Sequence, residues 1–170
     1  MTITKKIKIA EQTLDTIREW IKAADQKVSI FLAFQGITLT LLIPNYLKSI
    51  TARFQTNTMS YWNEFFIISA TLLLALAICN ALDAVLPRLG NNKKNMSLLY
   101  FGSIAAMSPQ QYTADMKNLT EAKYLDELLS QIHINSKIAY SKHKKFWNSI
   151  IFFIIGMTFF VGTYISLKFL

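Results

Sequence analysis

The residues best suited to chemistry are cations and aromatic rings that share the middle of the chain. Between Arg88 and Lys145 lie nine basic residues and four acidic ones, with aromatic side chains interleaved. Cations neutralise phosphate groups and an aromatic ring stacks on any nucleobase, so this composition suits a nucleotide or single-stranded nucleic acid. The residues predicted to bind such a ligand are Arg88, Lys93, Lys94, Tyr100, Lys137, Tyr140 and Lys142.

A membrane surface is a second explanation for part of this charge. Lys142, Lys144 and Lys145 come just before an apolar run. Lysines at that position meet anionic lipid headgroups and fix the orientation of a span. For Lys93 and Lys94, phosphate binding and plain solvation are both compatible with a polar loop. The sequence leaves these explanations open.

No catalytic or metal-binding arrangement accompanies the cations. The chain has no phosphate-binding glycine loop, no dinucleotide fingerprint and no nucleophilic serine elbow. His133 and His143 are ten residues apart, which on one helix places them on different faces and argues against a metal pair. The single cysteine, Cys79, cannot form an internal disulfide. We therefore expect no enzyme activity, no cofactor and no metal site.

Three long apolar runs must position these residues. Each is close to the roughly 20 residues that a helix needs to cross a bilayer. The chain is 52% hydrophobic and only 16% charged, against about 25% charged residues in a typical soluble domain. The predicted parts are a cytoplasmic amphipathic helix (1–27), a first span (28–47), an external loop (48–64), a second span (65–86), a cytoplasmic loop and long helix with the oligomer and ligand region (87–148), and a third span (149–170).

The distribution of basic residues predicts the orientation. Fifteen of the 18 lysines and arginines precede the first run or lie between the second and the third. Cytoplasmic loops are enriched in basic residues, so the N-terminus and the middle segment are expected in the cytoplasm and the C-terminus outside. The predicted fold is an all-α membrane protein with three transmembrane helices, of which the first and third continue as long cytoplasmic helices.

The N-terminal segment carries an apolar stripe with alternating spacings of three and four residues. Its positions are Ile7, Ala10, Leu14, Ile17, Ile21, Ala24 and Val28. Three such heptads without glycine or proline predict one continuous helix from about Thr4 to Ile43. Pro44 is expected to end it, because proline lacks a backbone donor and disfavours helical geometry at the preceding residue.

The same stripe continues into the first span through Phe31, Gln35, Thr38 and Leu42. A glutamine that faced lipid would leave polar atoms in hydrocarbon without a partner, at a cost of several kcal/mol. This face is therefore predicted to meet protein or water. One interpretation is helix packing joined by a side-chain hydrogen bond, and the other is a pore-lining or gating face.

The stretch after the second span is the least regular part of the chain. Asp83, near the end of that span, is expected to pair with Arg88 or with another helix, although acidic residues in spans are often functional. Ser97–Ala106 is predicted as a short strand or an extended lid. These features give the middle segment an irregular first half.

A strong helix start follows at Ser108. Serine as N-cap, Pro109 as the first helical residue and Gln111 as the third are a favourable combination. No helix breaker follows before Gly156. The sequence therefore predicts one helix from about Pro109 through the third span.

Three short motifs around the spans resemble landmarks of one family. They are Asp25-x-Lys27-x-Ser29 before the first span, Tyr100-Phe101-Gly102 after the second, and Asn135-Ser136-x-Ile138-Ala139-x-x-Lys142 before the third. In this order they resemble the Pycsar-effector transmembrane family of bacterial anti-phage defence, over about residues 20–170. The compact form, without an appended binding domain, looks most like the effector of the Hailong system.

The resemblance implies a multi-pass effector of the bacterial inner membrane, with a nucleotidyltransferase or cyclase as its functional partner. A Hailong-type relative implies a homotetrameric ion channel that single-stranded oligodeoxyadenylate holds closed, whereas related systems activate their effectors with cyclic mononucleotides. Three spans rarely enclose a pore, so a channel independently requires an oligomer.

The expected function is a nucleotide-gated channel that depolarises the inner membrane and arrests growth, as in abortive infection. Two alternatives stand beside it. One is a holin-like toxin that disrupts the membrane without a ligand. The other is a structural membrane subunit that scaffolds a partner protein. The nucleotide, and whether it opens or closes the protein, stay open.

Overall fold

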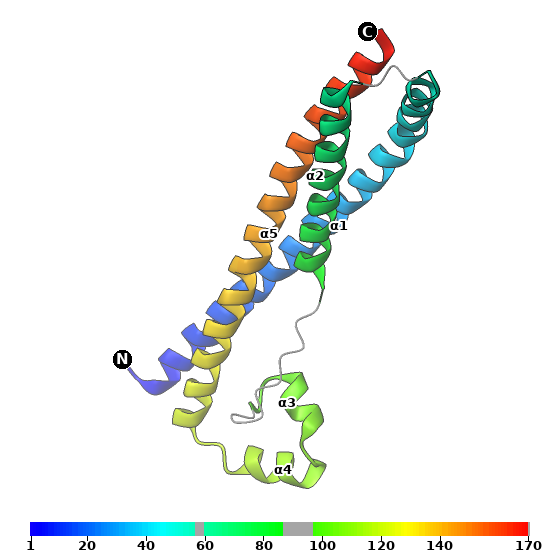
Figure 1. Ribbon diagram of the computed structural model, residues 1–170. Helices are drawn as coiled ribbons and strands as arrows, with labels where there is room; N and C mark the ends of the chain where they lie inside the picture. The colour runs from blue at the N-terminus through cyan, green and yellow to red at the C-terminus, as the bar shows by residue number, and fades with distance from the viewer. Residues whose placement is uncertain (57–59, 87–96, 170) are drawn as a thin grey trace. The chain divides into compact units, whose positions relative to one another are not determined.

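All the regular structure in the described part of the chain is helical. The computed structural model describes residues 1–56, 60–86 and 97–169. These residues form five helices and no strand: α1 (Ile3–Gln55), α2 (Tyr61–Val85), α3 (Phe101–Ala106), α4 (Pro109–Lys117) and α5 (Glu121–Phe169) (Figure 1). Three of them, α1, α2 and α5, are long and apolar enough to cross a membrane. The prediction of an all-α fold with three long apolar helices is confirmed.

The helices contribute to two compact units, which are described separately. Unit 1 comprises Met1–Ala24 and Pro87–Ser141, and unit 2 comprises Asp25–Leu86 and Lys142–Leu170. α1 and α5 contribute to both units, α2 belongs to unit 2, and α3 and α4 belong to unit 1. The assignment of residues 1–27, 28–47, 48–64, 65–86, 87–148 and 149–170 to membrane, cytoplasm and exterior stays a prediction.

Small residues on α2 allow the helices of unit 2 to pack closely. The buried positions of α2 are Ala70, Leu74, Ala77, Ala81 and Ala84, a stripe that is mostly alanine. Small side chains let helix backbones approach, which favours association inside a membrane. Opposite this stripe lies Gly156 of α5, where an added Cβ would lie 3.0 Å from Cγ of Leu74. The glycine therefore permits the close approach of α5 to α2.

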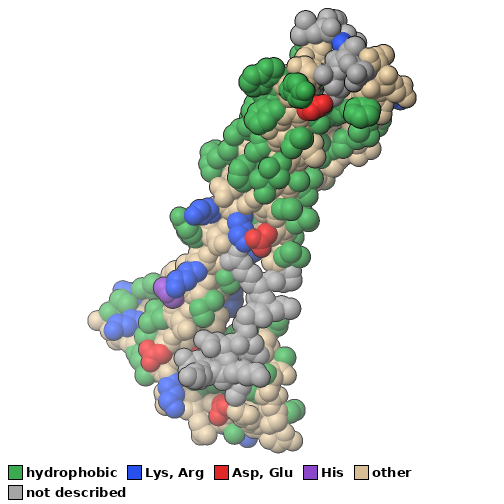
Figure 2. Space-filling model, viewed as in Figure 1, with side chains coloured by type: hydrophobic (Ala, Val, Ile, Leu, Met, Phe, Trp, Pro, Cys, Tyr) green, Lys and Arg blue, Asp and Glu red, His purple; other side chains and the backbone are tan. Residues whose placement is uncertain are grey.

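Unit 2 is apolar on its outside as well as in its core. Its core includes Tyr46 and Phe160, whose ring centroids are 4.1 Å apart. Exposed apolar side chains occur on all three of its helices, at Ile30, Phe34, Ile37, Leu41, Phe65, Ile68, Leu72, Ile154 and Ile165. Figure 2 shows hydrophobic side chains over much of the visible face of these helices. A helix bundle that is apolar all round is typical of a membrane environment.

The prediction that Pro44 ends the first helix is wrong. α1 continues through Pro44 to Gln55. Proline removes the hydrogen bond that its own nitrogen would donate to Thr40, and its ring crowds the same carbonyl group, but packing retains the turns beyond it. Tyr46 is buried against Phe160, and Arg53 donates from Nε to the carbonyl oxygen of Leu167 at 3.1 Å. Tertiary contacts thus outweigh the local preference.

The apolar stripe of α1, predicted to meet protein or water in its membrane part, packs inside the subunit. In unit 1, Ala10 and Leu14 form a buried cluster with Leu128 of α5, and Ile7 packs against it. The remaining positions of the stripe are also buried or half-buried, namely Ile17, Ile21, Ala24, Val28, Phe31, Gln35, Thr38 and Leu42. The heptad spacing therefore identified the packed side of α1 along both units.

The prediction of a strand or extended lid over Ser97–Ala106 is wrong for its second half. Phe101–Ala106 forms the short helix α3, preceded by the extended residue Tyr100. The Tyr100 ring lies against Gly102, where an added Cβ would be only 2.6 Å from a ring carbon. A side chain at Gly102 would displace that ring, which explains why a glycine follows Tyr100-Phe101.

The prediction of one unbroken helix from Pro109 is also wrong, although its start is confirmed. The Ser108 hydroxyl caps α4 by accepting a hydrogen bond from the backbone N–H of Gln111 at 3.2 Å. α4 then ends at Lys117, and α5 begins at Glu121. The Thr120 hydroxyl accepts from the N–H of Lys123 at 3.4 Å, as an N-cap does. The sequence Asn118-Leu119-Thr120 therefore contains a stop and a new cap without proline or glycine.

Candidate functional site

A line of polar contacts crosses the apolar interior of unit 2. Gln35 of α1 is 1% exposed and donates from Nε2 to the Ser149 hydroxyl of α5 at 3.4 Å. The Ser149 hydroxyl donates in turn to the carbonyl oxygen of Ala77 in α2 at 2.6 Å. The other amide atom, Oε1 of Gln35, is buried without a hydrogen-bond partner among the described residues. Three helices are thus connected through two side chains.

The other two residues of the predicted pore or inter-helix face lie on the same side of α1. Phe31 is half-buried, and its ring meets those of Phe146 and Phe153 edge to face at 5.8 and 5.5 Å. Thr38 is half-buried. Within the subunit, Phe31 and Gln35 therefore contact α5, which is the inter-helix arrangement. A pore-lining role for Phe31, Gln35 and Thr38 stays a prediction.

A buried lysine joins the same three helices seven residues before Ser149. Lys142 of α5 donates from Nζ to a carboxylate oxygen of Asp25 on α1 and to the carbonyl oxygen of Ala84 on α2, the latter at 2.8 Å. Its side chain is 8% exposed, whereas that of Asp25 is 39% exposed. The neighbouring Lys145 pairs with Asp83. Asp83 thus pairs with another helix, one of the partners that the sequence predicted.

The contacts of Lys142 and Lys145 lie at the C-terminal end of α2. The carbonyl groups of the last turn of a helix have no partner within the helix, and the helix dipole is negative there. Ala84 lies one residue before the last residue of α2, Val85. An ammonium group at this point is therefore stabilised by the backbone and by the Asp25 carboxylate. Removing one partner of a buried ion pair costs about 3–5 kcal/mol, and the partial exposure of Asp25 reduces that cost.

The residues predicted to bind a nucleotide fall in both units. Lys142 belongs to unit 2, whereas Tyr100, Lys137 and Tyr140 belong to unit 1. Lys137 and Tyr140 are exposed. Tyr100 is half-buried beside Phe101, with ring centroids 4.8 Å apart. The remaining predicted ligands, Arg88, Lys93 and Lys94, lie outside the described residues.

Unit 1 contains a cavity that the sequence did not indicate. Its volume is about 720 Å³, and α4, α5 and the segment around α3 line it. Eight of its twelve lining residues are polar: Ser97, Asp115, Asn118, Lys123, Asp126, Glu127, Ser130 and Gln131. The charged groups are three carboxylates and one ammonium. A cavity of this size accommodates a small molecule, and its wall offers mainly hydrogen-bond acceptors.

A hydrogen-bonded network holds one side of the cavity in place. The Ser97 hydroxyl donates to a carboxylate oxygen of Glu127 at 2.6 Å and accepts from Nε2 of Gln131 at 3.1 Å. Gln131 is buried, and its backbone carbonyl oxygen accepts from Nδ2 of Asn135 at 2.8 Å. Asn135 begins the third sequence motif, and Gln131 lies four residues before it. That motif is therefore a sequence signal beside this network.

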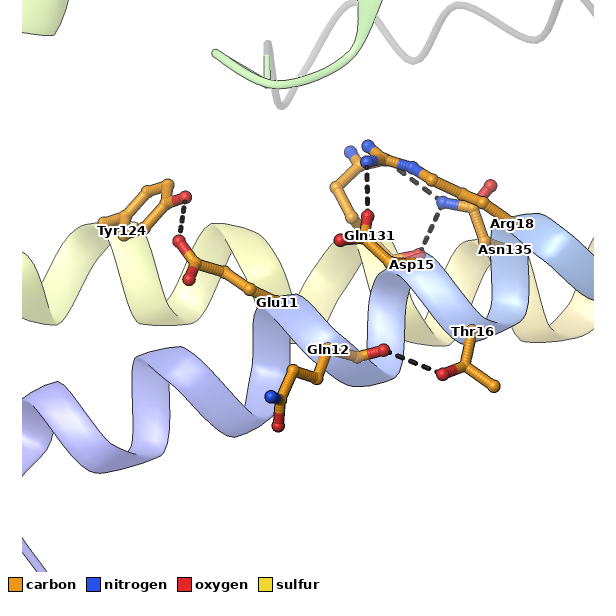
Figure 3. Close-up of polar contacts among 8 residues, drawn as sticks. All are labelled: Glu11, Gln12, Asp15, Thr16, Arg18, Tyr124, Gln131 and Asn135. Atoms are coloured by element: carbon orange, nitrogen blue, oxygen red, sulfur yellow. Dashed lines mark hydrogen bonds and ion pairs between the residues drawn. The ribbon is translucent and has the colours of Figure 1, made fainter.

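Polar contacts along α1 and α5 complete unit 1 (Figure 3). The Tyr124 hydroxyl donates to the Glu11 carboxylate at 2.8 Å. This hydrogen bond to Glu11, together with burial, raises the pKa of Tyr124 above its ordinary value of 10.0. Asp15 and Arg18 form an exposed ion pair within one turn of α1, which contributes little to stability in water.

The described residues contain no group of three or more metal-binding side chains that could hold a metal ion. The exposed Cys79 lies in α2. The described residues also provide buried polar links between helices and a cavity in unit 1.

Comparison with known proteins identifies the family. The model of the Pycsar effector protein domain matches residues 9–167. No curated protein and no solved structure matches the chain. The closer likeness to the Hailong effector stays a prediction. Because the matched region covers almost the entire sequence and includes all three apolar helices, the chain belongs to the Pycsar effector family, the membrane effectors of bacterial anti-phage defence.

Proposed function

We propose that this chain forms a homo-oligomeric channel in the bacterial inner membrane that a nucleotide signal opens or closes. Opening depolarises the membrane and stops growth of the infected cell. The family supports a membrane effector under the control of a cyclic nucleotide signal. The charge distribution supports a cytoplasmic N-terminus and middle segment. The chain acts by binding and conformational change, without catalysis.

The buried link between Gln35, Ser149 and Ala77 is the observation that carries the channel proposal. A purely lipid-facing bundle gains little from a buried glutamine whose Oε1 has no partner among the described residues. Such an amide suits a helix that exchanges one set of partners for another, because its second arrangement can satisfy the atom that the first does not. Aromatic rings fill this interior within one subunit, so the proposed ion path runs between subunits and requires an oligomer, which we propose to be a tetramer.

We propose that the signal binds to unit 1. Ring and exocyclic N–H groups of a nucleobase can donate to the carboxylates and amides of the cavity wall. The phosphate group then lies toward Lys123, the ammonium group of the cavity wall. Arg88, Lys93, Lys94 and Lys137 remain basic residues that the sequence predicts to bind the signal. Lys142 contributes indirectly, because its ammonium already contacts Asp25 and the Ala84 carbonyl. Tyr100 and Tyr140 remain proposed stacking partners.

The ligand can be identified with the purified full-length protein. Mass spectrometry of co-purifying molecules, followed by binding measurements with cyclic mononucleotides and single-stranded oligodeoxyadenylate, distinguishes the two ligand classes. Lys123→Glu should weaken binding by about tenfold or more, because a charged hydrogen bond is lost and a fourth carboxylate is added. Lys22→Glu is the matched control, since Lys22 is an exposed lysine of α1 in unit 1 outside the cavity.

The alternatives are separated when membrane permeability is measured beside nucleotide binding. A holin-like toxin binds no nucleotide yet permeabilises membranes. A scaffold binds no nucleotide and leaves membranes intact. Equal affinity of Lys123→Glu and Lys22→Glu would show that the signal binds elsewhere than the cavity.

A further inference from the structure

The chain passes between its two units at three points, and one side chain reaches residues beside all three. Unit 2 consists of two chain segments. The first begins at Asp25 on α1 and ends at Leu86, just after α2, and the second begins at Lys142 on α5. The Lys142 ammonium contacts the Asp25 carboxylate and the carbonyl oxygen of Ala84, two residues before Leu86. Within unit 2, one lysine therefore ties together the three segments at the place where each enters or leaves the unit.

The contacts of this lysine differ from those of an ordinary surface ion pair. The Lys142 side chain is 8% exposed, so its ammonium has given up nearly all of its contact with water. It is compensated by one charge and by one carbonyl group at the negative end of α2. If α2 moves away, or if Asp25 turns toward solvent, the ammonium loses a partner and must be hydrated.

Such a group has two favourable arrangements and a costly range between them. In the first, the ammonium is shielded from water and contacts both Asp25 and the Ala84 carbonyl oxygen. In the second, the helices separate far enough for water to reach Nζ. Intermediate separations leave a buried charge with only one partner, which is the least stable case. A packed interface with two discrete arrangements is what converts a small displacement into a switch.

We propose that Lys142 is a clasp that holds unit 2 in its non-conducting arrangement, and that opening the effector requires the ammonium to leave Asp25 and the Ala84 carbonyl. This inference rests on the proposed channel function, and it adds the residue at which the resting state is locked. The ligand must favour one arrangement of the clasp over the other, since a ligand with equal affinity for both shifts nothing. Lys145 and Asp83 form a second, more exposed pair beside it, which supports the clasp without burying a charge.

Four variants of the full-length protein in liposomes test the clasp. Lys142→Met and Asp25→Asn each remove one partner, Lys142→Arg keeps the charge and the donors, and Asp15→Asn is the control. Asp15 is an aspartate of the same helix in an exposed pair with Arg18, with side chains 71% and 53% exposed. We expect Lys142→Met and Asp25→Asn to raise ion flux without ligand by about tenfold or more. Lys142→Arg should stay within about threefold of the wild type, and Asp15→Asn should equal it.

Two further readouts separate a clasp from simple loss of folding and from failure of the channel proposal. Each variant must elute as the wild-type oligomer, and a double-mutant cycle on thermal unfolding measures the coupling of Asp25 with Lys142 independently of flux. Folded Lys142→Met and Asp25→Asn variants whose ligand-free flux equals that of a ligand-responsive wild type would overturn the clasp and leave the channel standing. If the wild type conducts no ions in any condition, with or without ligand, the channel proposal fails. A double-mutant cycle that shows no coupling between Asp25 and Lys142 would then overturn the clasp as well.

Discussion

Ser149 donates its hydroxyl hydrogen to the carbonyl oxygen of Ala77, across the interface between α5 and α2. Seven residues earlier on α5, Lys142 makes the equivalent contact to Ala84, seven residues later on α2. The two helices are antiparallel, so this repeat defines their register over two turns (Figure 1). Backbone carbonyls of an alanine-rich helix thus serve as acceptors for side chains of its neighbour.

The Ser149 link predicts a specific loss of stability. Ser149→Ala removes the bond to Ala77 and leaves Nε2 of Gln35 buried without its acceptor, so the free energy of unfolding should fall by about 1–2 kcal/mol. Thermal unfolding in detergent micelles measures the effect. Thr158→Ala is the control, because the exposed Thr158 hydroxyl donates to the Ile154 carbonyl oxygen of its own helix. Adding Gln35→Leu to Ser149→Ala should recover stability, since neither polar group then remains unpaired. A double variant less stable than Ser149→Ala contradicts this explanation.

The two glycines in the apolar part of α5 should respond differently to alanine. An added Cβ at Gly162 meets nothing within 4 Å, whereas one at Gly156 meets Cβ of Leu73 at 3.2 Å. Gly162→Ala should raise the free energy of unfolding by about 0.5–1 kcal/mol through helix propensity. Gly156→Ala should lower the thermal midpoint, because α2 and α5 must separate slightly. Equal midpoints for the two variants would mean that α2 and α5 do not pack closely at Gly156.

The heptad stripe predicts which side chains of α1 can be shortened without destabilising unit 1. Leu14 is 2% exposed and packs against Leu128, so Leu14→Ala should destabilise the protein by about 2–5 kcal/mol. Ile9→Ala is the control, since Ile9 is 46% exposed on the same helix. Protection of unit 1 amides, measured by hydrogen exchange, should fall only in Leu14→Ala. Similar exchange in both variants would show that the stripe is not the packed face.

The Tyr124 contact predicts a dependence on alkaline pH. Glu11 accepts the phenolic hydrogen and raises the pKa of Tyr124, so the folded protein holds this proton more tightly than the unfolded chain. The contribution to stability is complete below the unfolded pKa of about 10 and disappears as pH rises through the folded pKa. Thermal unfolding from pH 8 upward should therefore show a steeper loss for the wild type than for Tyr124→Phe. Parallel curves would exclude the linkage.

Sequence patterns predicted the long elements well because periodicity reports burial over many residues. The alternating three- and four-residue spacing from Ile7 to Leu42 identified the packed face of α1. Local signals were less decisive. Pro44 disfavours a helix, yet Tyr46 and Arg53 beyond it contact α5 and retain the helical turns. The opposite error occurred at Asn118-Leu119-Thr120, where α4 ends and Thr120 caps α5 although no proline or glycine lies between them.

The partners of polar residues could not be predicted from the sequence. Gln35 was expected to need a partner, but Ser149 lies 114 positions away. Lys142 was interpreted as a phosphate or headgroup ligand, because cations near a span usually are exposed. Its pairing with Asp25 depends on the parallel alignment of α1 and α5, which brings together the first and third sequence motifs. The cavity of unit 1 likewise depends on the turn between α4 and α5.

Ion flux from liposomes that contain the purified full-length protein tests the proposed function most directly. Flux is followed in the absence of ligand, with cyclic mononucleotides and with single-stranded oligodeoxyadenylate. The nucleotide-controlled channel predicts that one of these ligands changes the flux severalfold in either direction, and that Lys123→Glu shifts the required ligand concentration upward. Flux that is absent under every condition, or present and unchanged by every nucleotide, would contradict it.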